Sequence, residues 1–214
     1  LYVSRRPRVS VFVTGNELIE PGNSLGKGQI YNSNLYVFND LIRKAGAKIE
    51  MSEVVKDDKN SLKLFLSKAL KNSDMVVLSG GISMGRYDYV RDVLIELGVE
   101  EHFWKVAQKP GKPLFFGTKE KKIIFGLPGN PVSSFIGFME WVWPVLRDIM
   151  GEKSKKTIYG ILEEPFPREK KKHRFLFGEV KYRNNRLVCS STSRIGSHML
   201  TSALGANCIL ELSL

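Results

Sequence analysis

The sequence predicts an α/β protein in which a mostly parallel sheet flanked by helices is followed by a small all-β domain. Three observations lead to this prediction. Over the first 150 residues, short apolar runs alternate with segments of helical hydrophobic period. Glycine-bearing turns follow several of these runs, as is typical at the ends of parallel strands. After a polar break at 151–156, the pattern changes to short β-type runs.

The strands and helices of the first part are read from these runs in order. Strands are expected at 9–13, 47–55, 75–78, 114–116 and 123–127, with a sixth possible at 103–106. Helices are expected at 33–45, 61–72 and 89–97, where apolar residues recur at the spacing of one buried face. A long helix from 132 to about 150 is apolar on more than one side, so its aromatic residues either join the core or face another subunit.

The rest of the chain divides into two further parts. Runs at 157–162, 175–182, 186–189 and 208–212 predict a small β-barrel or sandwich. Residues 1–8 begin with leucine and contain an Arg-Arg-Pro-Arg run, and we expect them to be the linker remnant of a missing N-terminal region. The expected domains are therefore an α/β domain at 9–150 and a C-terminal β-barrel domain at 151–214.

Composition argues against several classes of protein. Two cysteines and three histidines form neither a disulfide framework nor a recognisable zinc pattern, so a cytoplasmic location is expected. No apolar run approaches the roughly 20 residues that span a bilayer, and no signal-peptide pattern occurs, so no membrane association is expected. The net charge of +11 suits a nucleic acid or an anionic small ligand. The basic cluster at 168–174 has few aromatic neighbours, which favours a solvated loop and no nucleic-acid binding.

Three glycine-bearing loops follow predicted strands, at 14–18, 79–85 and 128–131. They are expected at one edge of the sheet, because the carboxyl ends of parallel strands lie together. Glycine lets backbone N–H groups approach a phosphate and form an anion-binding concavity. One such loop alone is more often a tight turn, but three at one edge favour a ligand site. Residues 22–28 are one residue short of a P-loop, and no G-x-G-x-x-G occurs, so an ordinary NTPase or Rossmann dehydrogenase is not expected.

Acidic residues are expected beside these loops. Glu17 lies in the first loop, Asp57 and Asp58 follow the second strand, and Asp88 follows the glycine-rich third loop. Carboxylates next to phosphate-binding loops suit Mg²⁺, which takes one or two carboxylates and completes its octahedron with water and phosphate oxygens. Asp88 is equally well explained as a helix N-cap, and Asp57 and Asp58 as turn and first-turn acids.

The run from 105 to 113 supplies positive charge. Its two prolines restrict the backbone, so Lys109 and Lys112 lie on a stiffened loop that suits an oxyanion. A plain surface turn is the alternative. Acids that hold a metal and lysines that hold an oxyanion together describe a site for phosphate esters or oxyanions.

At these residues the sequence resembles the C-terminal half of the MoeA and gephyrin E-domain family, the molybdopterin molybdenumtransferases. The matching runs are TGNEL at 14–18, GQIYNSN at 28–34, the Asp57-Asp58 pair, SGGISMGRYDYV at 79–90, KPGKP at 109–113 and GLPGNPVSS at 126–134. The C-terminal β unit resembles the family's last domain more loosely. Two positions depart from the family pattern, Asn16 in place of an aspartate and Arg86 after Gly85.

The resemblance implies the fold of the MogA-type adenylyltransferases and the insertion of molybdate into adenylylated molybdopterin, with release of AMP and a divalent metal such as Mg²⁺. Glu17, Asp58 and Asp88 would be the catalytic and metal-holding residues. Lys105, Lys109, Lys112 and Ser133 would bind the oxyanion or pterin phosphate. The substrate or nucleotide would be bound by Thr14, Gly15, Asn34, Ser79, Gly80, Gly81, Ser83, Gly85, Pro128, Gly129 and Asn130.

The resemblance also implies partners. The full-length protein would be a homodimer, a MogA-type adenylyltransferase would supply its substrate, and the chain without further domains would turn over poorly. Two alternatives remain: a MogA-type adenylyltransferase, and a non-catalytic scaffold of the same family. Molybdate and tungstate fit equally, since both are tetrahedral oxyanions of nearly the same size and charge.

Overall fold

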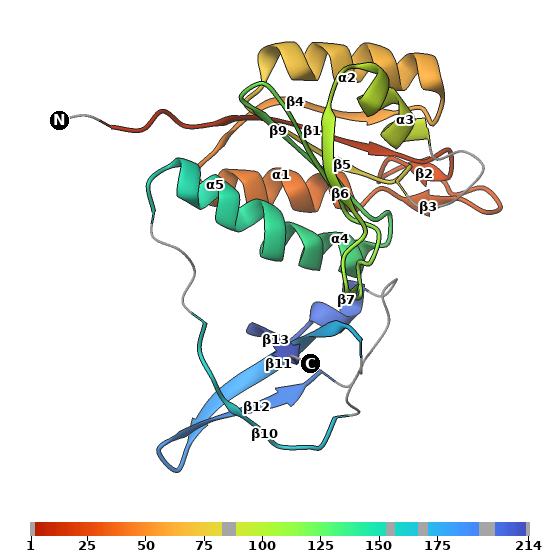
Figure 1. Ribbon diagram of the computed structural model, residues 1–214. Coiled ribbons are helices and arrows are strands. Elements are labelled where there is room, and N and C mark those ends of the chain that lie inside the picture. Colours follow the sequence, from red (N-terminus) through yellow and green to blue (C-terminus); the bar gives the residue numbers. More distant parts are fainter. Residues whose placement is uncertain (1–2, 83–88, 153–156, 167–170, 193–199, 213–214) are drawn as a thin grey trace.

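The computed structural model describes residues 3–82, 89–152, 157–166, 171–192 and 200–212. Figure 1 shows a layered α/β unit and, beside it, a smaller unit of strands formed by the C-terminal part of the chain. The arrangement agrees with the predicted fold class. Among the described residues, no helix combines the length and apolar character that crossing a membrane requires.

A six-stranded sheet forms the centre of the α/β unit, in the order β4-β1-β5-β9-β8-β6. Its strands are β1 (Arg8–Thr14), β4 (Lys48–Val55), β5 (Met75–Ser79), β6 (Glu100–Trp104), β8 (Phe115–Lys119) and β9 (Lys122–Leu127). The first four in the sheet order are parallel to one another. β8 runs antiparallel to both of its neighbours, β6 and β9. Its direction relative to β9 follows from their two-residue connection, because a parallel crossover needs about a dozen residues.

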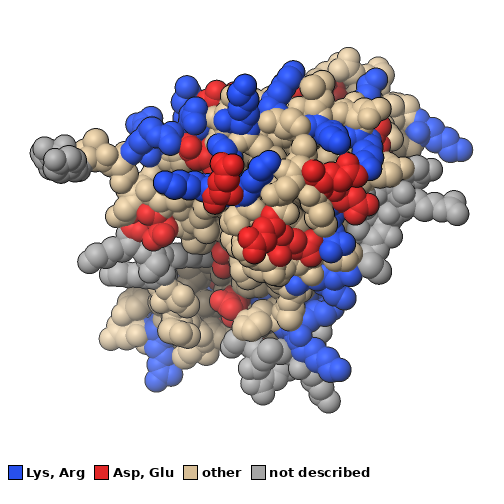
Figure 2. Space-filling model, turned by 45° about the horizontal axis from the view of Figure 1, so that its top comes forward, with Lys and Arg blue, Asp and Glu red and all other residues tan. Residues whose placement is uncertain are grey.

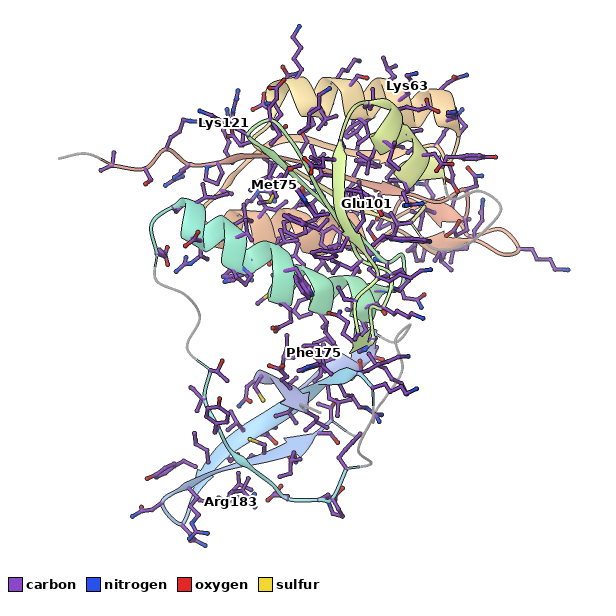
Figure 3. All side chains as sticks on the ribbon, viewed as in Figure 1. Lys63, Met75, Glu101, Lys121, Phe175 and Arg183 are labelled. Carbon is purple, nitrogen blue, oxygen red and sulfur yellow. The ribbon has the colours of Figure 1, made fainter. Side chains whose placement is uncertain are left out.

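Helices cover both faces of this sheet (Figure 1). α1 (Asn34–Lys44) and the long helix beginning at residue 131 lie on one face, and α2 (Lys59–Asn72) and α3 (Tyr89–Glu96) lie on the other. Successive side chains of β1 point to opposite faces of the sheet, so Val11 packs toward α1 and Phe12 packs toward α2. Met75 at the start of β5 is fully buried (Figure 3).

The predicted helix from 132 to about 150 is interrupted. It consists of α4 (Pro131–Gly137), a π-helical turn η1 (Phe138–Val142) and α5 (Trp143–Ile149). Pro144 lacks an N–H and its ring would collide with the carbonyl four residues earlier in a regular α-helix. A wider turn immediately before the proline relieves that conflict.

The C-terminal region forms a second sheet around β11 (His173–Arg183). β12 (Arg186–Ser191) and β13 (Cys208–Leu212) flank β11, and β10 (Ile161–Leu162) pairs with β12. The described strands follow an open order, and no pairing between β10 and β13 closes them into the barrel that the sequence suggested.

The two sheets are joined in two ways. The short strand β7 (Gln108–Lys109), which the sequence did not predict, comes from the α/β unit and pairs with β11. A separate apolar cluster packs Phe175 and Phe177 of β11 against Val132 and Ile136 of α4, and Figure 3 shows Phe175 at this junction.

Charges of both signs cover the face seen in Figure 2, where Asp and Glu side chains lie between those of Lys and Arg. One example is the pairing of Lys59 and Lys63 on α2 with Glu96 on α3. On this face the basic excess therefore does not form a surface of a single sign.

Candidate functional site

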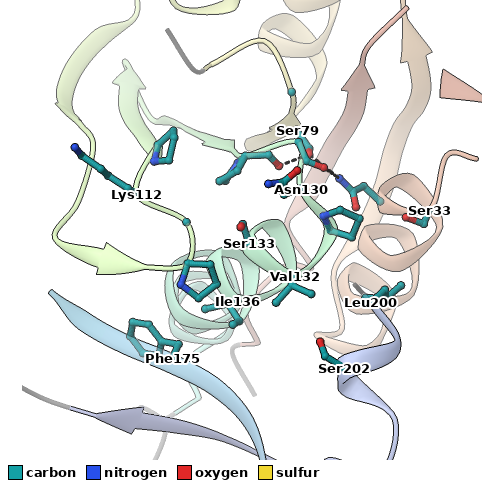
Figure 4. A pocket seen from close by; sticks show the side chains of 18 of the residues that line it. Ser33, Ser79, Lys112, Asn130, Val132, Ser133, Ile136, Phe175, Leu200 and Ser202 are labelled. Carbon is teal, nitrogen blue, oxygen red and sulfur yellow. Dashed lines mark hydrogen bonds between the residues drawn. The ribbon is translucent and has the colours of Figure 1, made fainter. Parts of the chain in front are cut away.

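A cleft of about 1140 Å³ lies between the carboxyl-side edge of the central sheet and the C-terminal sheet (Figure 4). Loops that follow β1, β5 and β9 form one wall, and residues of β11, β12 and the 3₁₀ turn η2 (Leu200–Ala203) form the other. The cleft lining includes these predicted positions: Thr14, Glu17, Asn34, Ser79, Gly80, Gly81, Lys109, Lys112, Pro128, Gly129, Asn130 and Ser133.

The glycine-bearing loops approach one another closely at the cleft. Gly80 has a φ of 92°, and a Cβ added there would lie 2.2 Å from the Thr14 carbonyl oxygen. A Cβ added to Gly129 would in turn lie 3.8 Å from the Gly80 Cα. Gly80 is therefore required both by its left-handed backbone and by the approach of the first loop.

Two predicted ligand residues instead brace these loops. The Asn34 amide donates to Ser79 Oγ at 3.0 Å and to the Gly129 carbonyl at 2.8 Å, and the Ser79 hydroxyl donates to the Pro128 carbonyl at 2.7 Å (Figure 4). Ser79 is only 1% exposed. Asn34 and Ser79 thus link the start of α1, the end of β5 and the loop after β9.

Among the described residues, the predicted acids Glu17 and Asp58 do not line the cleft together. Glu17 lines the cleft and folds back over Gly15, since a Cβ on Gly15 would lie 2.8 Å from Glu17 Oε1. Asp58 lies outside the cleft lining, so its predicted metal-holding role stays a prediction. It is the N-cap of α2 and accepts a hydrogen bond from the Ser61 backbone N–H at 2.9 Å, which lowers the pKa of the Asp58 carboxyl. Asp57 instead accepts from the Thr14 hydroxyl at 3.3 Å.

Asp88, like Ser83 and Gly85, lies outside the described residues. In the part of the chain that is described, no group of three or more His, Cys, Asp or Glu side chains could hold a metal ion. Glu17 is the one predicted metal ligand among the described residues that lines the cleft.

We call residues 105–113 the lysine loop. Lys109 and Lys112 line the cleft, together with the hydroxyl-bearing Ser133 on α4. Lys105 lies outside the lining, with its Nζ 3.8 Å from the centre of the Trp104 ring, and its role in oxyanion binding stays a prediction. This cation–π contact directs its charge toward the indole.

The second wall brings cations that the sequence interpretation assigned to a solvated loop. Lys172 and Arg174 line the cleft beside the lysine loop, because β7 pairs with β11 and sets Lys109 next to Arg174. Alternation along 173–183 marks a strand but does not reveal which partner it meets. The remaining wall is supplied by Phe175, Leu176, Phe177, Ser191, Thr192, Leu200 and Ser202. Cationic side chains facing glycine-rich backbone suit an anion with both phosphate and oxyanion groups.

Comparison with known proteins gives the same division of the chain. Residues 10–148 match the family described as "Probable molybdopterin binding domain", and residues 159–213 match "MoeA C-terminal region (domain IV)". Molybdopterin molybdenumtransferase of Nostoc sp. is 43% identical over 152 residues, which are 70% of this chain and 35% of that protein. The enzyme of the same name from Haemophilus influenzae is 32% identical over 97% of this chain and 52% of its own length.

Solved structures agree. The crystal structure of the molybdopterin biosynthesis MoeA protein from Pyrococcus horikoshii is 31% identical with a TM-score of 0.76, over 98% of this chain and 50% of that one. Molybdenum cofactor biosynthesis protein B, at 15% identity and a TM-score of 0.51 over 70% of this chain and 97% of its own, shares the fold of the α/β unit. The chain thus spans about half, or less, of the length of the MoeA relatives named here.

Proposed function

The chain belongs to the MoeA family of molybdenum cofactor biosynthesis proteins, and we propose that its cleft binds adenylylated molybdopterin and molybdate. The reaction inserts molybdenum into the dithiolene of the pterin and releases AMP. The observation that supports this proposal most strongly is the cleft itself, in which glycine-rich loops line the same space as lysine side chains of the lysine loop and the arginine of β11.

The two walls have separate tasks in this proposal. Backbone N–H groups at Gly81 and Gly129 receive the phosphates, because the absence of side chains lets a ligand approach the backbone there. Lys109, Lys112 and Arg174 hold the tetrahedral oxyanion by charge-assisted hydrogen bonds. Ser133 adds a hydroxyl between the two groups.

A divalent metal that enters with the substrate phosphates would be held by Glu17, which lines the cleft, since Mg²⁺ takes one or two carboxylates and completes its octahedron with water and phosphate oxygens. Glu17 is positioned to orient water or a phosphate-bound cation at the first loop. The whole protein, as proposed, is a cytoplasmic homodimer that receives its substrate from a MogA-type adenylyltransferase.

The test is release of AMP from adenylylated molybdopterin with and without molybdate. We expect molybdate-dependent release that falls when Lys109 or Arg174 is changed to alanine. Changing Lys63 to alanine should leave it unaltered, because Lys63 lies on α2 outside the cleft lining and pairs with Glu96 on α3. Release by this chain alone is expected to be slow beside that of a longer relative. Adenylylation of molybdopterin from ATP would instead identify a MogA-type enzyme, and molybdate binding without any turnover in a full-length protein would identify a scaffold.

A further inference from the structure

Gln108 is a buried polar residue in the wall of the cleft. Its side chain belongs to β7 and is only 3% exposed. Its Oε1 accepts a hydrogen bond from the Trp141 indole N–H at 2.9 Å, and its Nε2 donates to the Pro110 carbonyl at 3.1 Å. Both ends of the amide are therefore bonded, and the side chain joins the π-helical turn η1 to the lysine loop.

The lysine loop closes around this amide. Gly111 has a φ of 91°, and a Cβ there would lie 2.7 Å from Gln108 Nε2 and 3.3 Å from the Ser133 carbonyl oxygen. Two backbone hydrogen bonds complete the loop, from Val106 N–H to the Lys112 carbonyl at 3.0 Å and from Lys105 N–H to the Leu114 carbonyl at 2.9 Å. The backbone that carries Lys109 and Lys112 thus packs around the Gln108 side chain.

The same residue also borders the second sheet. Gln108 lies opposite His173 in the β7–β11 pairing, and the next pair sets Lys109 opposite Arg174. The His173 N–H donates to the Ala107 carbonyl at 2.9 Å. A displacement of Gln108 would therefore change the separation between the cations of the lysine loop and the cation of β11.

We propose that Gln108, held by Trp141, is the positioning residue that fixes the lysine loop and thereby sets the affinity of the cleft for a tetrahedral oxyanion. The identity of the oxyanion in this inference rests on the proposed function. The anchoring of the lysine loop by Gln108 rests only on the hydrogen bonds described above. A methionine at this position would fill nearly the same volume and leave the Trp141 N–H and the Pro110 carbonyl without their bonds.

The test compares three variants, Gln108→Met, Trp141→Phe and the double variant, with Gln29→Met as the matched control. Gln29 also uses its amide, accepting from the Gly26 N–H at 2.8 Å, but it is half-buried and does not line the cleft. Calorimetric titration measures the dissociation constants of molybdate and of AMP separately. Amide hydrogen exchange measures the protection of Val106 and Lys105 N–H groups in the loop.

We expect Gln108→Met to weaken molybdate binding about ten-fold while AMP binding changes less than about two-fold. Loop amides should exchange faster, and Trp141→Phe should reproduce much of the effect, with the double variant no worse than Gln108→Met. An unchanged molybdate affinity, an equal loss for both ligands, or unchanged loop exchange would each overturn the inference. If the unmodified chain binds no molybdate, the proposed function fails, and loop exchange alone then decides whether Gln108 is the anchor.

Discussion

Two glycines with similar positive φ angles are required for different structural reasons. Gly80 and Gly22 both have φ near 95°, at 92° and 98°. A Cβ at Gly80 meets the Thr14 carbonyl oxygen at 2.2 Å, whereas a Cβ at Gly22 meets nothing within 4 Å. The first glycine is needed for the contact between loops, and the second only for its turn.

We therefore expect Gly80→Ala to lower the free energy of unfolding by at least about 3 kcal/mol, since backbone strain and a collision with main chain add together. Gly22→Ala should cost about 1 kcal/mol, from strain alone. Urea unfolding of both variants measures the difference. Equal losses of unfolding free energy in the two variants would show that the loops can separate without cost. That result would contradict the close approach between Gly80 and the Thr14 carbonyl.

Asp58 illustrates a residue whose role the sequence alone does not decide. An acid after a strand and before a helix fits a metal ligand and an N-cap equally well, and the choice depends on where its side chain points. The hydrogen bond to the Ser61 N–H settles that direction. By contrast, the cleft positions of Gly80, Lys109 and Asn130 were predictable, because each follows from strand order and a local turn.

Changing Asp58 to alanine should lower the melting temperature by about 2 °C, and changing it to asparagine should leave it nearly unchanged, since asparagine also caps helices. Neither change should alter molybdate binding. Thermal unfolding and calorimetry of the two variants check both points. A loss of molybdate affinity in Asp58→Asn would support the predicted catalytic role.

At the scale of elements, one carboxylate ties the segment before β1 to the start of β5. Asp74 accepts hydrogen bonds from the Arg5 guanidinium at 2.9 Å and from the Arg8 backbone N–H at 2.7 Å. These bonds lower the pKa of the Asp74 carboxyl from 3.8 to about 2. Because the folded pKa is lower than the unfolded one, the stabilisation is present above about pH 4 and is lost as the pH falls from 4 to 2.

We expect Asp74→Asn to reduce the free energy of unfolding by about 1 kcal/mol at pH 7, a value discounted because Arg5 is largely solvent-exposed. The difference from the unmodified chain should shrink to near zero by pH 2. Denaturant unfolding across this pH range measures it, with Asp40→Asn, an exposed partner of Lys44, as the control. A difference that persists unchanged at pH 2 would mean that the ionised carboxylate is not the source.

The sequence largely predicted which segments form helices and strands, but it predicted the direction of the strands in the sheet less well. Hydrophobic period located β1, β5, β9 and the helices because burial on one or both faces leaves that pattern. The antiparallel direction of β8 follows from a two-residue connection, so loop length was the signal that the sequence interpretation did not use. The π-helical turn before Pro144 depends on how a local conflict is resolved within a packed helix, which period alone does not show.

At the scale of the molecule, the cleft depends on contact between two units that the sequence separates. Phe177 of β11 is 7% exposed and its ring lies 5.5 Å from that of Phe135 on α4. Pairing between β7 and β11 adds a second link. Such long-range contacts leave no local pattern, and for that reason Arg174 was not predicted as a cleft residue.

Phe177→Ala should destabilise the chain by about 3 kcal/mol through the cavity it creates. It should also make unfolding less cooperative, because the interface that joins the units is weakened. Calorimetric and denaturant unfolding report both effects, and Tyr182→Ala, at a side chain 70% exposed on the same strand, serves as the control. Similar losses for the two variants would show that the β11 interface does not couple the units.

The most direct measurement is a calorimetric titration of molybdate into the unmodified chain and into Lys109→Ala, Arg174→Ala and the double variant, with Arg186→Ala as an exposed control on β12 outside the cleft lining. If the lysine loop and β11 hold one oxyanion together, each single change should weaken binding about ten-fold or more, and the double variant should depart from additivity. Binding that depends on Lys109 but is the same in Arg174→Ala and Arg186→Ala would show that β11 takes no part, contradicting a site shared by the two units.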